Sequence, residues 1–388
     1  MKRKKNIVAI TFLVVMVGCE GGGKQASDDL ITVDVTKNYP KKELILQDFM
    51  DVEYIPLETT DDFLTQGLVK DIGKEIILVT NRFNDGDIFV YNRNGKGIRK
   101  INRKGQGGEE YTYIFTITLD EDNEELFVSD IFAKCFFVYD LYGSFKRSFK
   151  HEANACTSYY TDVFNYDRDN LICYDRENEE RGFVLISKQD GKITKEIKIP
   201  FIELKEAKVR RMIDEETSVS NSITSYHIIP YNNKWILTEH SSDTIFSCSH
   251  NYNMTPFIIR TPSVQSLNPE VFLVLGIITK QYYFMKAVKK IYNFETEEGF
   301  PSTEFMFDKQ ENAIFGFTVY NSDYSNNKQI NMISRPVNNE IATWQIIQAY
   351  QLLEAYNKGE LKEGKLKEIA AELDEEDNPV IMIVKHKK

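Results

Sequence analysis

Few runs of this sequence combine residue types that could do chemistry, and the glycine-rich run Gly105-Gln106-Gly107-Gly108 is the first to consider. A loop of this kind cradles phosphate only where it opens a helix, because the helix N-terminus supplies N–H donors and partial positive charge. The run instead continues into Tyr111-Thr112-Tyr113-Ile114-Phe115, a β-type segment, and no Gly-Lys-Ser/Thr follows. We therefore predict a turn between two sheet units.

The acidic run Asp120-Glu121-Asp122-Asn123 has the composition of a calcium loop. An EF-hand loop needs glycine at its sixth position and glutamate at its twelfth. Those positions hold Glu125 and Ile131, so we predict an acidic hairpin turn. Paired carboxylates for glycoside hydrolysis lie roughly 5–10 Å apart. With 59 acidic residues such pairs arise by chance, and the sequence singles out none.

Histidine and serine patterns are equally sparse. The five histidines show no metal-ligand spacing such as His-Glu-x-x-His, and no Gly-x-Ser-x-Gly elbow presents a nucleophilic serine. His227, in Ser-Tyr-His-Ile-Ile, is the histidine best placed for a role at a strand edge. We expect no metal, no cofactor and no catalytic residue.

The N-terminus carries one clear chemical signal. Basic residues at 2–5 precede an apolar run, Ile7–Val17, which is too short to span a membrane and has the length of a secretory h-region. The run ends in Met16-Val17-Gly18-Cys19, which resembles a bacterial lipobox with Met in place of the usual Leu. We predict a lipoprotein signal peptide over 1–18 and acylation of Cys19. The alternative is an ordinary secretory signal with a chance cysteine.

Residues 19–30 contain three glycines and no apolar pattern, which indicates a flexible tether. The remaining cysteines are Cys135, Cys156, Cys173 and Cys248, and an exported chain could pair them in three ways. Cys135 and Cys173 lie within apolar strand-like runs, so we favour buried free thiols that pack as small hydrophobic groups. No CxxC pair or Cys/His cluster indicates zinc.

The composition favours an exported β protein. The net charge is −11 and the basic residues are scattered, which excludes nucleic acid or an anionic membrane surface as the main partner. The 21 Tyr and 25 Phe residues favour strands.

An internal repeat indicates the architecture. An aromatic strand, a polar turn and a glycine recur at Phe89–Gly95, Phe136–Gly143 and Phe183–Gly191, with the closing glycines 48 residues apart. A repeat of this length is typical of a β-propeller, in which each unit is one small sheet. We expect six or seven blades within a single domain over 31–388.

The strands of these blades can be placed from short apolar runs. Paired middle strands are predicted at Ile76–Thr80 with Ile88–Tyr91, Leu126–Asp130 with Phe136–Asp140, Leu171–Asp175 with Phe183–Ile186, and Trp235–Thr238 with Ile245–Cys248. A fifth unit should contain Tyr282–Phe284, Phe305–Asp308 and Phe315–Tyr320. Ile31–Val35 also alternates as a strand.

Two stretches interrupt the β pattern. Pro200–Asp214 is interpreted as a short helix, and 341–373 as a helical segment in which Gly359 separates two helices. Val380–Val384 is then the closing strand, and pairing it with Val52–Leu57 would join the two chain ends in one blade and protect an open edge.

Three passages together resemble the Bacteroides-type six-bladed β-propeller lipoproteins. They are the entry strand 52–60, the phrase 105–111 and the closing phrase Asp377-Asn378-Pro379-Val380. In the second passage Gly108 replaces the family's usual proline, while Glu110 and Tyr111 keep their places. The resemblance covers nearly all of the mature chain. It implies a six-bladed propeller tethered to an envelope membrane, and it brings no established catalytic residues.

These observations favour a monomeric lipoprotein of the bacterial cell envelope, expected at the outer membrane. We expect it to bind a carbohydrate or an envelope protein through propeller loops without catalysis. Aromatic side chains stack on sugars, and the candidate residues are Tyr111, Tyr159, Tyr160, His227, Tyr282 and Tyr283. For each aromatic pair the alternative is packing between blades, because neighbouring strand residues point to opposite faces. The rival functions are a carbohydrate-active hydrolase or lyase in the central channel and a protein-interaction scaffold.

Overall fold

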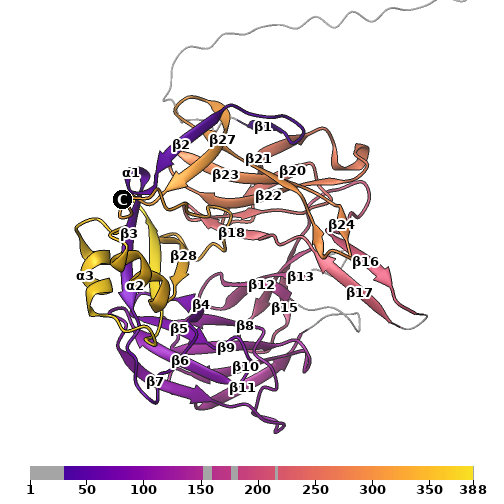
Figure 1. The fold of residues 1–388 in the computed structure, drawn as a ribbon. Helices are drawn as coiled ribbons and strands as arrows, with labels where there is room; N and C mark the ends of the chain where they lie inside the picture. The colour runs from indigo at the N-terminus through magenta and orange to yellow at the C-terminus, as the bar shows by residue number, and fades with distance from the viewer. Residues whose placement is uncertain (1–29, 152–159, 176–181, 215–216, 388) are drawn as a thin grey trace, which may run out of the picture.

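Runs of β-branched and aromatic residues form the strands of six sheets, which are arranged as the blades of a β-propeller around a central channel (Figure 1). The computed structural model describes residues 30–151, 160–175, 182–214 and 217–387. The six-bladed propeller that the resemblance implies is confirmed, within the six or seven blades expected from the repeat and the chain length. In blades 1 to 3 the strand that comes first in the chain lies nearest the channel and the later strands lie progressively further out, whereas in blades 4 to 6 the outermost strand comes from the N-terminal segment.

Blades 1 to 3 each contain four antiparallel strands in chain order. Blade 1 consists of β4 Leu68–Ile72, β5 Ile76–Thr80, β6 Asp87–Asn92 and β7 Gly97–Asn102. Blade 2 consists of β8 Thr116–Asp120, β9 Glu125–Asp130, β10 Cys135–Asp140 and β11 Phe145–Lys150. Blade 3 consists of β12 Tyr160–Asn165, β13 Asn170–Asp175, β14 Phe183–Ser187 and β15 Ile193–Ile197.

Blades 4 to 6 combine later strands with strands from the N-terminal segment. Blade 4 consists of β18 Ile228–Tyr231, β19 Lys234–Leu237, β20 Thr244–Cys248 and β21 Met254–Thr261, with β1 Ile31–Asp34 outermost. Blade 5 consists of β22 Val271–Ile278, β23 Tyr282–Lys289, β26 Ser302–Asp308 and β27 Ala313–Tyr320, with β2 Lys41–Ile45 outermost. Blade 6 consists of β28 Ile341–Ile347, β29 Val380–His386 and β3 Met50–Pro56.

The N-terminal segment runs along the outer edges of three consecutive blades (Figure 1). Strands β1 and β2 add in parallel to blades 4 and 5, and a short helix, α1 Leu46–Phe49, connects β2 to β3. Strand β3 pairs antiparallel with β29, with Ile55 opposite Ile381. The predicted ring closure between the two chain ends is thus confirmed, and the added strands cover edges that would otherwise be open.

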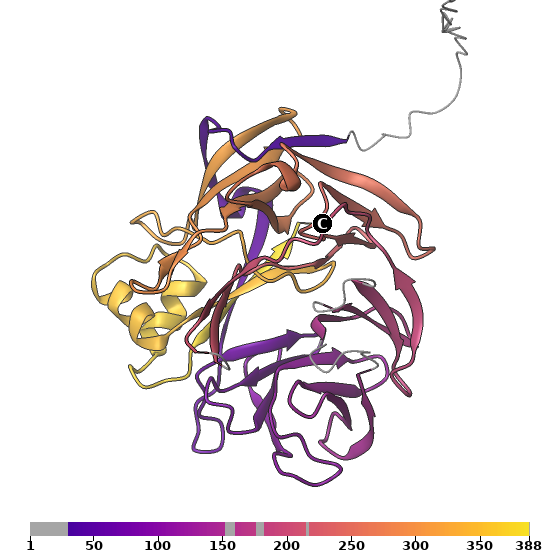
Figure 2. The same cartoon turned by 90° about the vertical axis from the view of Figure 1, so that its right-hand side faces the viewer.

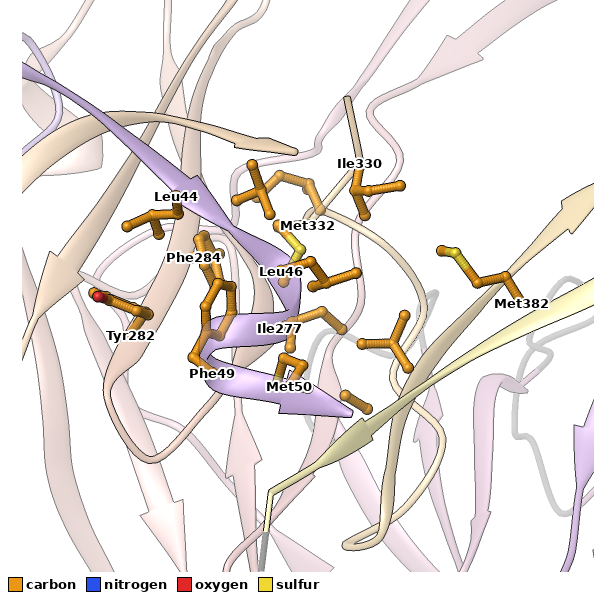
Figure 3. Packing of buried hydrophobic residues seen from close by; sticks show 14 of the residues in the cluster. Leu44, Leu46, Phe49, Met50, Ile277, Tyr282, Phe284, Ile330, Met332 and Met382 are labelled. Carbon is orange, nitrogen blue, oxygen red and sulfur yellow. The ribbon is translucent and has the colours of Figure 1, made fainter. Parts of the chain in front are cut away.

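Hydrophobic packing holds neighbouring blades together. Six clusters of buried hydrophobic residues occur in the described part of the chain, one at each junction between blades. At the junction of blades 5 and 6, Phe49 from α1 packs edge-on against Tyr282, with ring centroids 5.0 Å apart, and lies close to Phe284 (Figure 3). Full burial of a side chain such as Phe49 contributes about 1.5–3 kcal/mol.

The repeated glycines occupy one structural position in blades 1, 2 and 3. Gly95, Gly143 and Gly191 each have a positive φ, of 80°, 86° and 72°, in the turn between the third and fourth strands. A Cβ on Gly143 would lie 2.8 Å from Ile101 of blade 1, and one on Gly191 would lie 2.4 Å from Phe149 of blade 2. The 48-residue period therefore reflects both a left-handed turn and close contact with the preceding blade.

Two secondary-structure predictions were wrong. Within Pro200–Asp214, the structure forms β16 Lys208–Met212, which pairs with β17 Ser218–Ser222 in a hairpin that projects from the ring (Figure 1). The β-branched residues Val209 and Val219 favour this strand pair over a helix. The start of 341–373 is likewise not helical, because 341–347 is rich in β-branched and aromatic residues and forms β28.

The rest of the 341–373 segment is helical as predicted. Helix α2 spans Ala349–Asn357 and helix α3 spans Lys365–Glu372, with Gly359 between them at a φ of 69°. Both helices lie on the outside of blade 6 (Figure 2). The short 3-10 helix η1 Val264–Ser266 and the hairpin of β24 Tyr292–Asn293 and β25 Glu298–Gly299 complete the elements.

The predicted signal peptide, Cys19 and nearly all of the tether lie outside the described residues. Among the residues that are described, no helix is long and apolar enough to cross a membrane.

Candidate binding site in the central channel

The channel has a cavity at each end. The inner strands of neighbouring blades run in the same direction, so residues that end these strands lie at one mouth and residues that precede them lie at the other. A cavity of about 270 Å³ is lined by Asp71, Glu121 and Asn165, at or just after the ends of β4, β8 and β12. A cavity of about 520 Å³ is lined by Phe115 and Thr224, which precede β8 and β18.

We call the smaller cavity the cationic mouth. It is lined by four basic side chains and by both tryptophans of the chain, namely Lys70, Lys74, Lys234, Arg335, Trp235 and Trp344. Two acidic residues at its rim are already engaged. Glu121 accepts hydrogen bonds from the backbone N–H groups of Lys74 and Glu75, and Asp122 lies 3.5 Å from Lys74 Nζ.

Lys70 is placed by an irregularity in the innermost strand of blade 1. The pairing of β4 with β5 shifts between Val69 and Asp71, so Lys70 is the extra residue of a β-bulge. Bulges re-aim side chains and are frequent beside functional sites. The Lys70 ammonium donates a 3.3 Å hydrogen bond to the Phe115 carbonyl oxygen and has no carboxylate within 4 Å among the described residues. Burial, together with the charge of Arg335, lowers the pKa of Lys70 to about 8.

Arg335 lies in the segment that leads into β28, far from Lys70 in sequence but beside it in the channel. Its guanidinium makes no hydrogen bond and no ion pair within 4 Å with any described residue. An arginine guanidinium offers five N–H donors in a planar fork that matches a carboxylate. Arg335 is therefore a half-buried cation with its donors still available.

Asp71 is an acidic group near Arg335, and it forms no ion pair within 4 Å with Lys70 or Arg335. Its two carboxylate oxygens accept backbone N–H groups from Ile72 and Leu119, at 2.9 and 2.8 Å. Complete burial raises the pKa of Asp71, against the lowering effects of these hydrogen bonds and of Arg335. Asp71 therefore fixes the junction of blades 1 and 2 and leaves the channel side of Lys70 and Arg335 open.

Aromatic rings form the other wall of the cationic mouth. Trp235 lies at the start of β19 and stacks on Tyr166 with ring centroids 5.7 Å apart, and Tyr166 in turn stacks on Tyr252 at 6.2 Å. Trp344, on the innermost strand of blade 6, is half-buried and lines the same cavity. An aromatic wall beside unpaired cations suits a ligand that has both an apolar ring face and a negative charge.

The residues proposed from sequence do not gather at this mouth. Tyr111 is buried between blades 1 and 2, where its hydroxyl donates to the Gly86 carbonyl oxygen at 2.7 Å. Tyr160 is buried between blades 2 and 3, and Tyr159 lies outside the described residues. Tyr282 packs towards blade 6 and Tyr283 towards blade 4, as expected if neighbours on a strand point to opposite faces.

His227 lies at the opposite mouth, just before β18. Its side chain is buried and stacks on Tyr174 with ring centroids 3.8 Å apart.

Sequence reasoning missed the residues of the cationic mouth, although two signals were present. Lys70 and Asp71 interrupt the otherwise apolar strand Leu68–Ile72 with two adjacent charges, which is unusual for an inner strand. The chain also contains only two tryptophans, and both line this cavity. The sequence around Arg335 gave no sign of a site, because Arg335 reaches the channel only once the ring of blades has closed.

Several other predictions can be assessed. The acidic run 120–123 forms the turn between β8 and β9, and the glycine-rich run 105–108 lies between blades 1 and 2, as expected. Cys135, Cys173 and Cys248 carry free thiols, which confirms the buried-thiol interpretation for Cys173. Burial raises the pKa of the Cys173 thiol. Cys156 lies outside the described residues.

Comparison with known proteins supports the fold and leaves the ligand open. A family model described as a domain of unknown function (DUF4934) matches residues 30–385. A protein from Bacteroides fragilis described as a candidate exported protein has a similar structure, with a TM-score of 0.58 and 15% identity over 92% of this chain and 100% of that one. No curated protein sequence matches.

Two further solved structures show weaker similarity. A member of the DUF4221 family from Bacteroides vulgatus has a TM-score of 0.47 and 11% identity over 88% of this chain and 98% of that one. A virginiamycin B lyase from Staphylococcus aureus has a TM-score of 0.37 and 11% identity over 86% and 99%.

Proposed function

The chain belongs to the family described as a domain of unknown function, DUF4934, and on that premise we propose that it is an exported protein that binds an acidic carbohydrate in the cationic mouth of its channel. One observation carries the proposal. Lys70 and Arg335 are cations without a carboxylate within ion-pair distance among the described residues, and they share a cavity with both tryptophans.

The side chains that line the cationic mouth determine which class of ligand it can bind. Removing a cation from water without a partner costs free energy, and a bound carboxylate would offset that cost through charge-assisted hydrogen bonds. Arg335 supplies a fork for the carboxylate, and Lys70 supplies a point charge. The half-buried Trp344 supplies flat apolar surface for a sugar ring, beside the buried Trp235. A uronic acid residue combines these properties, whereas a neutral sugar would leave both cations unpaired.

The location of this binding activity is part of the proposal. The basic residues at 2–5, the apolar run and Cys19 support export and lipid attachment, and residues 19–30 would tether the propeller to the bacterial outer membrane. The similar Bacteroides fragilis structure, described as a candidate exported protein, is consistent with that location. We expect the propeller to act as a monomer, and the acidic glycan to be its partner.

The tryptophans make the proposal directly testable. Because both line the cationic mouth, a bound ligand should change the intrinsic tryptophan fluorescence. The protein would be titrated with an oligogalacturonide and, as a matched control, with its methyl ester, which has the same sugar rings without the charge. Saturable quenching or a spectral shift with the acid and none with the ester is the expected result. Equal responses, or no response to either, would contradict the proposal.

A lyase acting on the same ligand class is the second candidate. A lysine with a pKa near 8 can serve as a general base at neutral pH, so Lys70 would remove the proton from the carbon adjacent to the uronate carboxylate while Arg335 neutralises that carboxylate. The glycosidic C–O bond at the next carbon then breaks, a carbon–carbon double bond forms, and the leaving oxygen takes the proton from Lys70. Such an enzyme would release an unsaturated uronate, which absorbs ultraviolet light. If that absorbance appears with the wild-type protein and not with Lys70→Met, the protein is a lyase and not only a binding protein.

A further inference from the structure

The larger cavity, at the opposite end of the channel, contains a group of polar side chains that the proposed binding function does not use. We call it the histidine mouth, and it is lined by Ser225, His227, His240, Tyr174, Glu239 and Thr161 together with apolar residues such as Leu204. Ser225 is half-buried in the segment that enters β18, and the hairpin β16–β17 flanks this cavity through Lys208 and Ser222.

The serine hydroxyl lies between two imidazole rings. Ser225 Oγ is 3.2 Å from His227 Nε2 and 2.8 Å from His240 Nε2. A neutral imidazole carries a proton on one nitrogen and a lone pair on the other, so the partner of the second nitrogen decides what each ring can do.

The backbone fixes the tautomer of His227. Its Nδ1 lies 2.8 Å from the Thr238 carbonyl oxygen, which can only accept, so Nδ1 carries the proton. The Nε2 atom of His227 is then the acceptor, and the Ser225 hydroxyl donates to it. Because that hydroxyl has a single proton, the contact with His240 must be an N–H donated by His240 Nε2 to Ser225 Oγ.

Packing holds His227 in this orientation. Tyr174 stacks on the imidazole with an interplanar angle of 10°, and the Tyr174 hydroxyl is anchored by a 3.0 Å hydrogen bond to Glu239 Oε2. The His227 backbone N–H donates to Asp162 Oδ2 at 2.6 Å. A hydroxyl that faces an oriented base meets the geometric requirement for an activated serine nucleophile.

Hydrogen-bond donors for a developing oxyanion lie beside the serine. Tyr226 follows Ser225 directly, and its backbone N–H donates no hydrogen bond to any described residue. The His240 Nε2–H group donates to Ser225 Oγ at 2.8 Å, so it lies within reach of an oxyanion on the acyl carbon that Ser225 Oγ would attack. Two such donors are the usual means of stabilising a tetrahedral intermediate in acyl transfer.

We propose that Ser225 and His227 form the nucleophile–base pair of an esterase site that removes small acyl groups from carbohydrate or other alcohol esters. Ser225 Oγ attacks the acyl carbon while its proton passes to His227 Nε2, and the oxyanion is held by Tyr226 N–H and His240 Nε2–H. The ester C–O bond then breaks, and the leaving alcohol takes the proton from His227. Water, deprotonated by His227, attacks the acyl-serine, which releases the carboxylic acid and restores the hydroxyl.

Covalent labelling tests this site without knowledge of the natural substrate. The protein would be treated with diisopropyl fluorophosphate, and separately with p-nitrophenyl acetate, and the modified peptide would be identified by mass spectrometry. We expect one adduct, on Ser225, which disappears in Ser225→Ala. Ser222→Ala is the matched control, because Ser222 lines the same cavity and should leave labelling unchanged.

Variants of the two histidines separate catalysis from structure. His227→Gln should slow labelling about 100-fold or more, the usual contribution of a positioned general base, with an unchanged circular dichroism spectrum. His240 is only half-buried, so the labelling rate of His240→Gln can be measured if His227→Gln does not fold. Absence of an adduct on Ser225, or equal labelling rates in wild-type protein and in whichever histidine variants fold, would overturn the proposal.

The two sites are tested independently. Oligogalacturonide binding is followed by tryptophan fluorescence and esterase activity by the adduct on Ser225, so each assay reports on one cavity. Loss of oligogalacturonide binding with intact Ser225 labelling would therefore count against the binding function alone, and the reverse result against the esterase site alone.

Discussion

Two lysines, the buried Lys188 and the half-buried Lys70, differ in how their charges are paired. The Lys188 ammonium lies between blades 2 and 3, where it donates 2.6 Å hydrogen bonds to both Asp120 Oδ2 and the Asp167 carbonyl oxygen. Among the described residues, the Lys70 ammonium has only the Phe115 carbonyl oxygen as a hydrogen-bond partner, at 3.3 Å, and the positive charge of Arg335 lies nearby. Removing one partner of a buried, fully paired charge is strongly destabilising, whereas an unpaired charge in a cavity is a candidate for binding a ligand.

The acid partner of Lys188 confirms that this pair belongs to the framework. Burial alone would raise the pKa of Asp120, but hydrogen bonds from Lys188 and Asn123 outweigh burial and hold that pKa below its usual value. Asp120 is therefore charged in the folded protein. Close by, Arg147 forms two hydrogen bonds to Glu125, at 2.7 and 2.6 Å, and also donates to the Lys188 carbonyl oxygen. Among the described residues at the junction of blades 2 and 3, Lys188 and Arg147 thus both have a carboxylate partner.

The largest expected effect comes from breaking the paired lysine. Lys188→Met leaves the Asp120 carboxylate buried without its cation, and losing one partner of a buried pair costs about 3–5 kcal/mol. Urea unfolding followed by circular dichroism would measure the loss. Replacing both partners, as Lys188→Met with Asp120→Leu, should recover much of it. A single variant as stable as wild type would mean that this pair is not structural.

Removing Lys70, the unpaired lysine, should not lower the stability of the protein as removing Lys188 does. Lys70→Met takes away a half-buried charge that no carboxylate pairs among the described residues, so stability should be unchanged or increased. Binding of an oligogalacturonide should weaken about 10- to 100-fold through loss of roughly 1.5–3 kcal/mol. Arg335→Met should behave alike. Tryptophan fluorescence titration and urea unfolding on the same samples provide both values. If Lys70→Met were less stable than the wild-type protein but bound the oligogalacturonide with wild-type affinity, Lys70 would be a structural residue and not a binding residue.

The titration of Lys70 sharpens the comparison further. Folding lowers the Lys70 pKa from 10.5 to about 8, so the charged form is disfavoured in the free protein, and stability should increase as the pH rises from about 8 to 10.5. A bound carboxylate favours the charged form, so affinity should decrease over the pH range just above 8. Lys70→Arg keeps its charge throughout and should flatten the affinity profile. A profile of the same shape in both proteins would exclude Lys70 as its origin.

The smallest expected effect concerns the aromatic wall. Trp344 is half-buried, and Trp344→Leu should weaken sugar binding by about 0.5–1.5 kcal/mol, the contribution of an aromatic contact beyond area. Trp235→Phe keeps a ring in the stack with Tyr166 and should weaken binding less. Each variant retains one tryptophan, so the same titration also assigns the fluorescence change. If both variants bound the sugar with wild-type affinity, the aromatic wall would not contribute to binding.

Much of the fold could be predicted because it depends on local chemistry. The spacing of Gly95, Gly143 and Gly191 indicated a repeated turn, which requires a positive φ, and apolar runs indicated the paired strands. The pairing of Val52–Leu57 with Val380–Val384 followed from the need to close the ring. The strands at Lys41–Ile45 and Lys208–Met212 were missed, because nothing local distinguishes an edge strand from a connection.

The site could not be predicted for a different reason. Arg335 and Lys70 become neighbours only after the ring has closed, and the β-bulge at Lys70 is a property of strand register. His227 could be singled out by its sequence context, but its partner His240 lies on another part of blade 4. Chemistry assembled at the axis of a propeller comes from many blades, so single-sequence patterns identify the blades more readily than the site.

A crystal structure of the protein with the oligogalacturonide bound would test the central claim most directly. We predict that a uronate carboxylate lies within hydrogen-bond distance of the Arg335 guanidinium and the Lys70 ammonium, with a sugar ring against Trp344. A ligand bound at the histidine mouth, on the outer edges of the blades, or in the channel without contact to either cation would contradict the account.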